Sequence, residues 1–532
     1  MMFKCPNCNG ALYYDIKKKV LKCQHCQSEV PVADYHTDNA AVLEDMSVYT
    51  CSNCGAQLIS PDQSAVAFCS YCGSEQILEE KLAKELNPKE IIPFRLTKES
   101  CIKRYQKAIK GKLYVPREFR NTQFLEKFRG IYIPYWRMET GFTDQPLSFE
   151  GYASYRSGDY YHYETFKLQA NLENTVVSMP YDASSNFDDT IADSIAPYRK
   201  ADVQEFYPGY LAGFCADTAD VSPDTYSKIA EEEAIETATE QITKSFKKTR
   251  NVTPKLPGKK KAKDFLQPRL IGTPALLLPV WFLTWRKNRR VAYMVVNGQT
   301  GRVSAELPVS YLSFFGCTLA AAAVLYGIMT LLVSMTAPTA LLISMTISTV
   351  ALILYQQQIK KIHDKETHVF DRGYFIEGRD TEISETKAER IRRRRERGFW
   401  AGKIGAVFVV LMLLEMCAYW LSDSMPDETA QLASVFLFPV IVYNVLRTLT
   451  FVKNVKEKSM LIDVLFGTAG IAFGYYVLFT LQVHDYMYYI GCILCILGVL
   501  VTCIGLIRKY NVLATRPLPS FFDRTGGDVH EG

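Results

Sequence analysis

Two nearly identical eight-residue stretches, CPNCNGAL near the start of the chain and CSNCGAQL 46 residues later, constrain the fold most. Each begins a unit in which two Cys-x2-Cys pairs are separated by 14 residues. A repeat that keeps its register in this way indicates an internal duplication. The candidate metal ligands are Cys5, Cys8, Cys23 and Cys26 in the first unit, and Cys51, Cys54, Cys69 and Cys72 in the second.

This cysteine spacing predicts two zinc ribbons. It places two tight knuckles at the ends of a short hairpin, where four thiolates surround a tetrahedral Zn²⁺. In a reducing compartment such pairs are typical of metal sites rather than disulfides. Each unit is too small to bury a core, so the ion is expected to supply folding free energy on the order of 10 kcal/mol. Four cysteines close the coordination, which predicts two structural Zn²⁺ ions, and His25 is expected to be a spectator.

Ribbons of this kind bind either proteins or nucleic acids. The first unit carries three consecutive lysines at 17–19, but the second is nearly neutral between its knuckles. Nucleic-acid binding normally requires a broad basic face. We therefore expect protein docking, with nucleic-acid binding as the alternative.

The fold class predicted for the 532 residues is multi-domain: two small β zinc ribbons, an α+β cytosolic domain and an all-α polytopic membrane domain of six helices. The expected boundaries are ribbon 1 at 1–30, a linker at 31–46, ribbon 2 at 47–80, the α+β domain at 81–309, transmembrane helices 1 and 2 at 310–356, a basic cytosolic loop at 357–400, transmembrane helices 3 to 6 at 401–508, and a cytosolic tail at 509–532.

Several segments of the middle region predict helices or strands. A helix is expected to start at Thr97 as its N-cap and to end near Gly111, and a longer one to start at Ser222, which precedes a proline. GIYIPYWRME and PALLLPVWFLTW predict strands, SFEGYASY and YYHYETFKLQ predict a hairpin, and NGQTG predicts the turn of the last hairpin. The lysine run GKKKAK around Lys259 is expected to be a solvated loop, with contact to acidic lipid as the alternative.

No catalytic motif is found in this region. G-x4-G-K-[ST], G-x-S-x-G, H-E-x-x-H and G-x-G-x-x-G are all missing from the sequence. The neighbouring carboxylates of Asp188 and Asp189 are expected at a solvated helix start. We therefore predict that the protein is not an enzyme and assign no catalytic residue.

Apolar runs of about 20 residues follow Ser310, and this is the length that a helix needs to cross a bilayer. The six predicted spans are 311–334, 337–355, 402–421, 431–449, 461–481 and 488–507.

The connecting segments predict the orientation of these spans. The segment 356–403 contains 13 Lys and Arg residues, including Arg392–Arg395, whereas the connectors on the other side contain none. The positive-inside rule then places both termini of a multi-pass cell-membrane protein in the cytosol. The start MMFKCPNC has no apolar segment of a cleavable signal, which fits that orientation. Arg392–Arg395 are also expected to attract anionic lipid.

Besides protein docking and nucleic-acid binding, transport is a third candidate function. Glu415 lies within the third predicted span and Asp463 near the start of the fifth, and carboxylates in membrane spans often mark pathways. The small residues of FGTAGIAFG, however, are more typical of helix packing, and Cys492 and Cys495 are expected to be apolar filler.

An ordered set of motifs resembles a known family. Together with the two cysteine units, the motifs are IIPFRLTKES at Ile91, FRGIYIPYWRME at Phe128, YPGYLAGFCAD at Tyr207, LLPVWFLTW at Leu277 and YMVVNGQTGRVSAELP at Tyr293. Over roughly the first 310 residues the chain resembles the YdjG-like proteins, bacterial membrane proteins with TFIIB-type zinc ribbons. The resemblance implies a non-enzymatic adaptor or scaffold that contacts flotillin-like or other membrane proteins in envelope-stress complexes. The alternatives are a membrane-tethered nucleic-acid-binding protein and a transporter.

Overall fold

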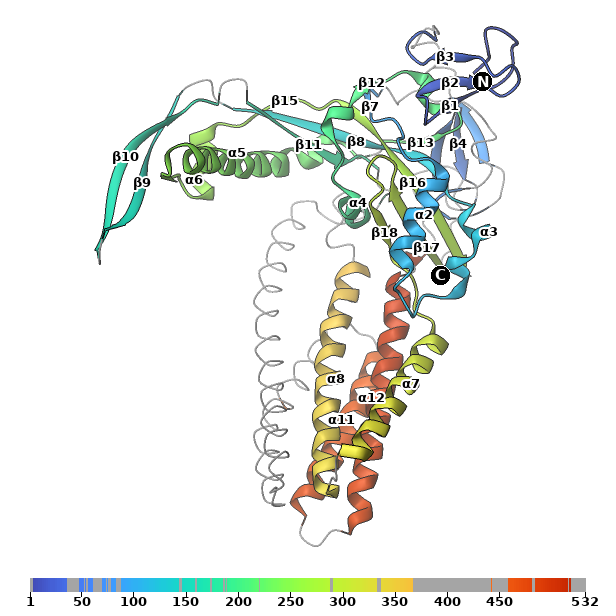
Figure 1. Ribbon diagram of the computed structural model, residues 1–532, viewed down its shortest axis with the longest axis vertical. Coiled ribbons are helices and arrows are strands. Elements are labelled where there is room, and N and C mark those ends of the chain that lie inside the picture. Colours follow the sequence, from blue (N-terminus) through green and yellow to red (C-terminus); the bar gives the residue numbers. More distant parts are fainter. Residues whose placement is uncertain are drawn as a thin grey trace.

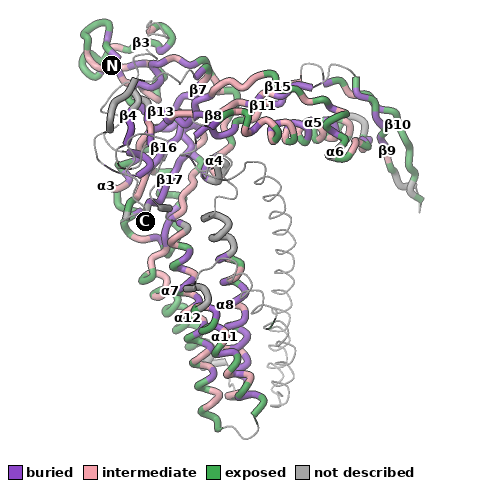
Figure 2. Tube along the Cα trace, turned by 180° about the vertical axis from the view of Figure 1, so that it is seen from behind, coloured by how far each residue is buried: buried purple, intermediate pink, exposed green. Residues whose placement is uncertain are grey.

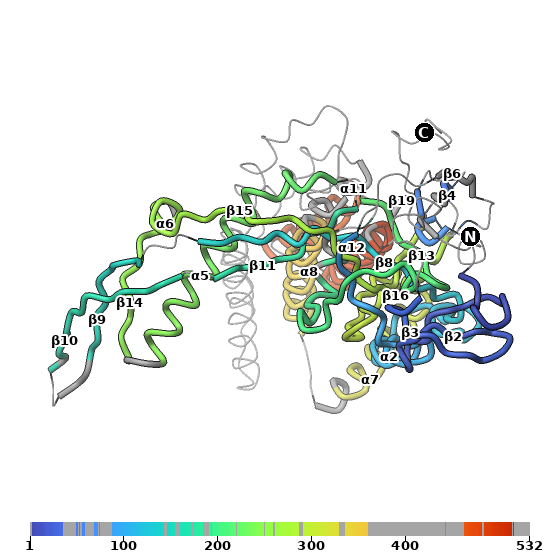
Figure 3. The backbone as a smooth tube through the Cα atoms, turned by 90° about the horizontal axis from the view of Figure 1, so that it is seen from above, coloured from blue at the N-terminus to red at the C-terminus, as the bar shows by residue number. Residues whose placement is uncertain are grey.

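The computed structural model describes residues 3–35, most of 47–366, Val442 and most of 458–517. A mixed-sheet domain, built from the N-terminal part of the chain, stands at one end of a bundle of long apolar helices (Figure 1). An arm of two long strands and two helices projects sideways from the sheet (Figures 1 and 3).

The first cysteine unit forms a small antiparallel sheet of its own. Its strands β1 (Leu12–Asp15), β2 (Val20–Cys23) and β3 (Glu29–Pro31) lie in the order β1-β2-β3. Alternate side chains of β1, those of Leu12 and Tyr14, are buried, as expected for a strand with one covered face.

The main sheet has thirteen strands within the described residues, with the central order β12-β7-β16-β8-β13-β5-β4-β6. Its strands are β4 (Ser47–Cys51), β5 (Gln57–Ser60), β6 (Leu78–Leu82), β7 (Glu90–Ile91), β8 (Arg129–Gly141), β11 (Val176–Asp182), β12 (Gln204–Glu205), β13 (Cys215–Asp217), β15 (Arg269–Gly272), β16 (Ala275–Lys287), β17 (Arg290–Asn297), β18 (Val303–Ala305) and β19 (Arg516–Pro517).

The two predicted apolar strands are the long central pair β8 and β16, which pair antiparallel. Their central segments, 131–136 in β8 and 275–283 in β16, are apolar or aromatic at every position because both faces of the sheet are covered there. In β16, Leu277 and Trp281 enter one core, while Leu278 and Val280 enter the other.

The helices of this domain begin where the sequence predicts. Thr97 caps α2, and its side chain accepts a hydrogen bond from the Ser100 amide. Ser222 caps the 3-10 turn η5, which leads directly into the long helix α5. The helices and 3-10 turns are α2 (Lys98–Ile109), η2 (Arg117–Arg120), α3 (Thr122–Leu125), α4 (Asp189–Ile195), η3 (Lys200–Asp202), η4 (Pro208–Leu211), η5 (Pro223–Tyr226), α5 (Ser227–Arg250) and α6 (Lys259–Leu266).

The arm consists of the predicted hairpin β9 (Leu147–Ser157) and β10 (Tyr160–Ala170), together with β14 (Thr253–Lys255), α5 and α6. The prediction of a loop at Lys259 is wrong, because this lysine begins α6. Ala262 and Leu266 are four residues apart and are both buried in the core of the arm, so one face of the lysine run packs as a helix.

Four helices among the described residues are long and apolar enough to cross a membrane. They agree with four of the six predicted spans, while the other two, 402–421 and 431–449, lie outside the described residues apart from Val442. The four helices are α7 (Tyr311–Leu332), α8 (Ala337–Glu366), α11 (Lys458–Phe479) and α12 (Asp485–Ala514). Exposed residues run along α7, whereas α8, α11 and α12 share a buried interior (Figure 2).

The sheet domain contacts the bundle just before its first described helix, α7, and just after its last one, α12. Just before α7, the backbone of Val309 forms two hydrogen bonds with the Asn511 side chain of α12, at 2.6 and 3.0 Å. After α12 the chain returns to the sheet, where β19 pairs with β17. The first and last described helices of the bundle are therefore joined to the same sheet.

Candidate metal centres

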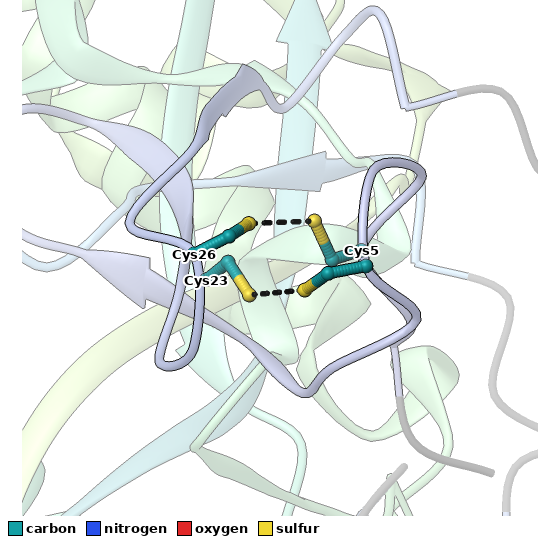
Figure 4. A group of neighbouring side chains, drawn as sticks. Cys5, Cys23 and Cys26 are labelled. Atoms are coloured by element: carbon teal, nitrogen blue, oxygen red, sulfur yellow. Dashed lines mark hydrogen bonds between the residues drawn. The ribbon is translucent and has the colours of Figure 1, made fainter.

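The structure brings the four cysteines of the first unit together. Their sulfur atoms all lie within 4.8 Å of one another, at the ends of two facing knuckles (Figure 4). The sulfur atoms of Cys5 and Cys26 lie 3.6 Å apart, and those of Cys8 and Cys23 lie 3.4 Å apart. The left-handed backbone conformations of Asn9 and Gln27, both with φ of 59°, close the two knuckles.

This geometry fits a tetrahedral metal ion. Four sulfur atoms about 2.3 Å from a central Zn²⁺ would lie about 3.8 Å from each other, close to the observed separations. Cys5 and Cys23 are buried, while Cys8 and Cys26 are exposed. His25 is exposed and is not a member of the four-sulfur cluster.

A hydroxyl group supports two of these sulfurs. Oγ of Ser28 lies 3.1 Å from the sulfur of Cys5 and 2.8 Å from that of Cys26. This interaction lowers the pKa of both thiols, that of Cys5 to about 6. A lowered pKa favours the thiolate, which is the form that binds a metal ion.

The second unit repeats this local structure. Cys51 and Cys72 have sulfur atoms 3.6 Å apart, and Cys69 completes a group of three within 4.8 Å; Cys54 lies outside the described residues. The backbone repeats as well. The Cys5 amide donates to the Gly10 carbonyl at 2.7 Å, and the Cys51 amide donates to the equivalent carbonyl of Ala56 at 2.9 Å.

The two units differ in their surroundings. All three described cysteines of the second unit are buried, within a core to which strands β16 and β17 also contribute. Strand β5 of this unit pairs with β13, which in turn pairs with β8, so the second unit is continuous with the main sheet.

Residues Ser70 and Tyr71 of the second knuckle also form hydrogen bonds with the sheet. The hydroxyl of Tyr71 donates a 2.6 Å hydrogen bond to the carboxylate of Asp217 in β13, and the Ser184 hydroxyl donates to the same oxygen. Thr284 of β16 donates to the backbone carbonyl of Ser70. The second candidate metal centre is thus part of the sheet's interior.

The first unit docks on the turn η4. The Tyr14 amide donates to the Ala212 carbonyl at 3.0 Å, and the Tyr14 ring meets that of Tyr210 edge-on at 5.3 Å. A Cβ at Gly209 would lie only 3.1 Å from Leu21, so glycine allows the ribbon to approach closely. The motif YPGYLAGFCAD therefore contacts both units, since η4 supports the first and β13 pairs with the second. This role is not predicted from the sequence, although the closely spaced glycines and tyrosines of the motif indicate a close backbone contact.

Several predicted residues lie away from these centres. Asp189 is the first residue of α4, which confirms the predicted helix start, and Asp188 lies outside the described residues. In the bundle, Asp463 of α11 accepts a 2.7 Å hydrogen bond from the Tyr355 hydroxyl of α8. Arg392–Arg395 and Glu415 lie outside the described residues.

The described chain thus combines two cysteine clusters able to hold metal ions, a mixed-sheet domain and four candidate membrane helices. It is similar to the uncharacterized protein YdjG of Bacillus subtilis (strain 168), with 28% identity over 317 residues that cover 58% of this chain and 90% of YdjG. This similarity agrees with the family resemblance of the motifs. No family model matches the sequence, and no solved structure matches it.

Proposed function

We propose that this protein is a non-enzymatic, membrane-anchored adaptor that presents a zinc-held docking surface in the cytosol. In this proposal both cysteine clusters bind structural Zn²⁺ and have the TFIIB-type ribbon fold. The two ribbons have different tasks: the second stabilises the sheet, and the first contacts the partner.

The observation that carries the proposal is that ribbon 1 packs on η4 and still exposes part of its cysteine cluster. One side of ribbon 1 packs on η4 through Tyr14 and Leu21, both of which are buried. The knuckle residues Cys8, His25 and Cys26 of the same ribbon are exposed to solvent. A small surface that is rigidly held and exposed is suited to specific protein contact, because little conformational entropy is lost on binding.

The arrangement of the bundle supports a cytosolic sheet domain with both termini on its side. The sheet precedes α7, and β19 returns to the same sheet after α12, so an even number of crossings separates them. Reduced thiols in both clusters suit the cytosol as well. On the resemblance to the YdjG-like family, we propose that the partners are membrane proteins, flotillin-like or otherwise, of an envelope-stress complex.

The test is affinity purification of the tagged full-length protein from detergent-solubilised membranes, with and without nuclease. We expect membrane proteins to copurify after nuclease treatment and to be lost in a Cys5→Ser/Cys8→Ser variant that still holds one metal ion. A Lys17→Gln/Lys18→Gln/Lys19→Gln variant serves as the charge control and should retain the partners. Recovery of mainly nucleic acid that is lost in the lysine variant and released by salt would contradict the proposal and favour a tethered nucleic-acid-binding protein.

A further inference from the structure

The tip of the arm exposes aromatic side chains on both faces of its hairpin. Tyr160 and Tyr163 are 76% and 70% exposed, and Tyr152 is 45% exposed. Because Tyr152 pairs with Thr165, two residues from Tyr163, these two tyrosines share one face, while Tyr160 lies on the other. These exposed rings are available for contact with a ligand on either face of the hairpin.

The helices that support this hairpin are basic at the same end. Helix α5 carries its glutamates in the half that begins beside the sheet, while residues 244–263 contain nine Lys and Arg and no acidic residue. Among the described side chains, Lys244 pairs with Glu240 and Lys263 with Glu231, both glutamates of α5. The sequence of this segment also contains Lys247, Lys248, Arg250, Lys255, Lys259, Lys260 and Lys261.

The end of the arm that carries these basic and aromatic residues points in the direction in which the bundle extends from the sheet. The arm runs outward from the sheet, and the β9–β10 hairpin bends toward the side on which the apolar helices lie (Figures 1 and 2). Seen from above, it extends well clear of α8, α11 and α12 (Figure 3). If these helices cross a bilayer, the tip faces the bilayer surface beside them.

We propose that the arm binds the anionic phospholipid surface of the membrane in which the chain is anchored. Tyrosines concentrate at the membrane–water interface, because the ring enters the apolar boundary while the hydroxyl stays hydrated. Lysines and arginines near an anionic leaflet are attracted to its surface potential. The arm thereby sets the orientation of the sheet domain relative to the membrane. The inference requires only that the helices span a bilayer, and it is independent of the adaptor function.

Nucleic acid is the competing ligand, since basic grooves with exposed aromatic residues also bind single strands. The anchoring helices favour lipid as the ligand. They hold the arm next to the bilayer, so the effective concentration of lipid at the arm is high and does not depend on the concentration of nucleic acid.

The experiment is hydrogen–deuterium exchange of the full-length protein in nanodiscs, either of phosphatidylcholine alone or with one third phosphatidylglycerol. We expect amide exchange in peptides covering 152–166 to slow several-fold in the anionic nanodiscs. A Lys247→Gln/Lys248→Gln/Lys261→Gln variant should lose this lipid dependence, and Tyr160→Ser/Tyr163→Ser should lose most of the protection.

The matched control is Lys103→Gln/Lys107→Gln/Lys110→Gln, which removes three exposed lysines from α2 and its C-cap. It should behave as the wild type, and unchanged exchange in β16 peptides shows that each variant is folded. Equal exchange of the hairpin in both lipids would overturn the proposal. So would protection that appears only after a single-stranded oligonucleotide is added and disappears at high salt.

Discussion

Tyr71, in the second knuckle, donates a 2.6 Å hydrogen bond to Asp217 in the strand that joins this knuckle to the main sheet. Both side chains are completely buried. A tyrosine hydroxyl is a protonated donor at neutral pH, and burial raises the pKa of Tyr71 well above its usual range. A buried carboxylate requires such donors because it has lost its hydration. This contact therefore links the second candidate metal centre to the stability of the sheet.

We expect Tyr71→Phe to lower the free energy of unfolding of the sheet domain by about 1–3 kcal/mol, because the buried Asp217 carboxylate loses one of its donors. Thermal unfolding of the detergent-solubilised protein, followed by tryptophan fluorescence, measures this change. Tyr207→Phe is the matched control, since it removes a hydroxyl that bonds Glu205 at 3.1 Å on the surface. Equal effects of the two substitutions would show that the contact with Asp217 carries no special stability.

The unequal burial of the two clusters predicts two rates of metal release. We expect about two metal ions per chain by elemental mass spectrometry, one removed quickly by a chelator and one slowly. The fast ion belongs to the first cluster, where Cys8 and Cys26 are exposed, and the slow ion to the buried second cluster. In Cys5→Ser/Cys8→Ser the fast phase should disappear and the slow phase remain. A single phase, or loss of both ions in that variant, would contradict the assignment.

The hydroxyl of Ser28 is expected to strengthen metal binding by the first cluster. Its hydroxyl lowers the pKa of Cys5 to about 6, so the stabilisation of the thiolate is present above the ordinary thiol pKa and is lost as pH falls through about 6. Removing it in Ser28→Ala should weaken metal binding by about 10–100-fold, the range for residues that support metal ligands. The pH midpoint of metal release should then rise, because protons compete better for the thiolates.

Ser74, 46 residues after Ser28, provides the comparison for this experiment. Its carbonyl accepts a hydrogen bond from the Cys69 amide at 2.8 Å, as that of Ser28 does from Cys23 at 3.0 Å. Ser74→Ala leaves the first cluster intact and should not change the pH at which the fast ion is released. A midpoint unchanged in Ser28→Ala would show that the hydroxyl has no influence on metal binding.

Local signals predicted much of this fold. The cap at Thr97, the apolar strand β8 and the hairpin β9–β10 depend on neighbouring residues, and the structure confirms each of them. The two cysteine units looked equivalent in sequence, because the spacing of ligands says nothing about what surrounds them. Their difference arises from β13 and η4, which lie more than 130 residues further along the chain. The helix that begins at Lys259 is not predicted for the same reason, because it depends on burial of Ala262 and Leu266 in the core of the arm.

The bundle allows a sharp test of close helix packing. A Cβ on Gly470 of α11 would lie 2.7 Å from the backbone of Leu494 and Cys495 in α12, whereas a Cβ on Gly316 of α7 would meet no atom within 4 Å. Small residues let membrane helices approach in this way. We therefore expect Gly470→Val to separate α11 from α12 and to lower the melting temperature of the solubilised protein, while Gly316→Val leaves it unchanged. Equal melting temperatures for the two variants would show that α11 and α12 are not packed backbone to backbone.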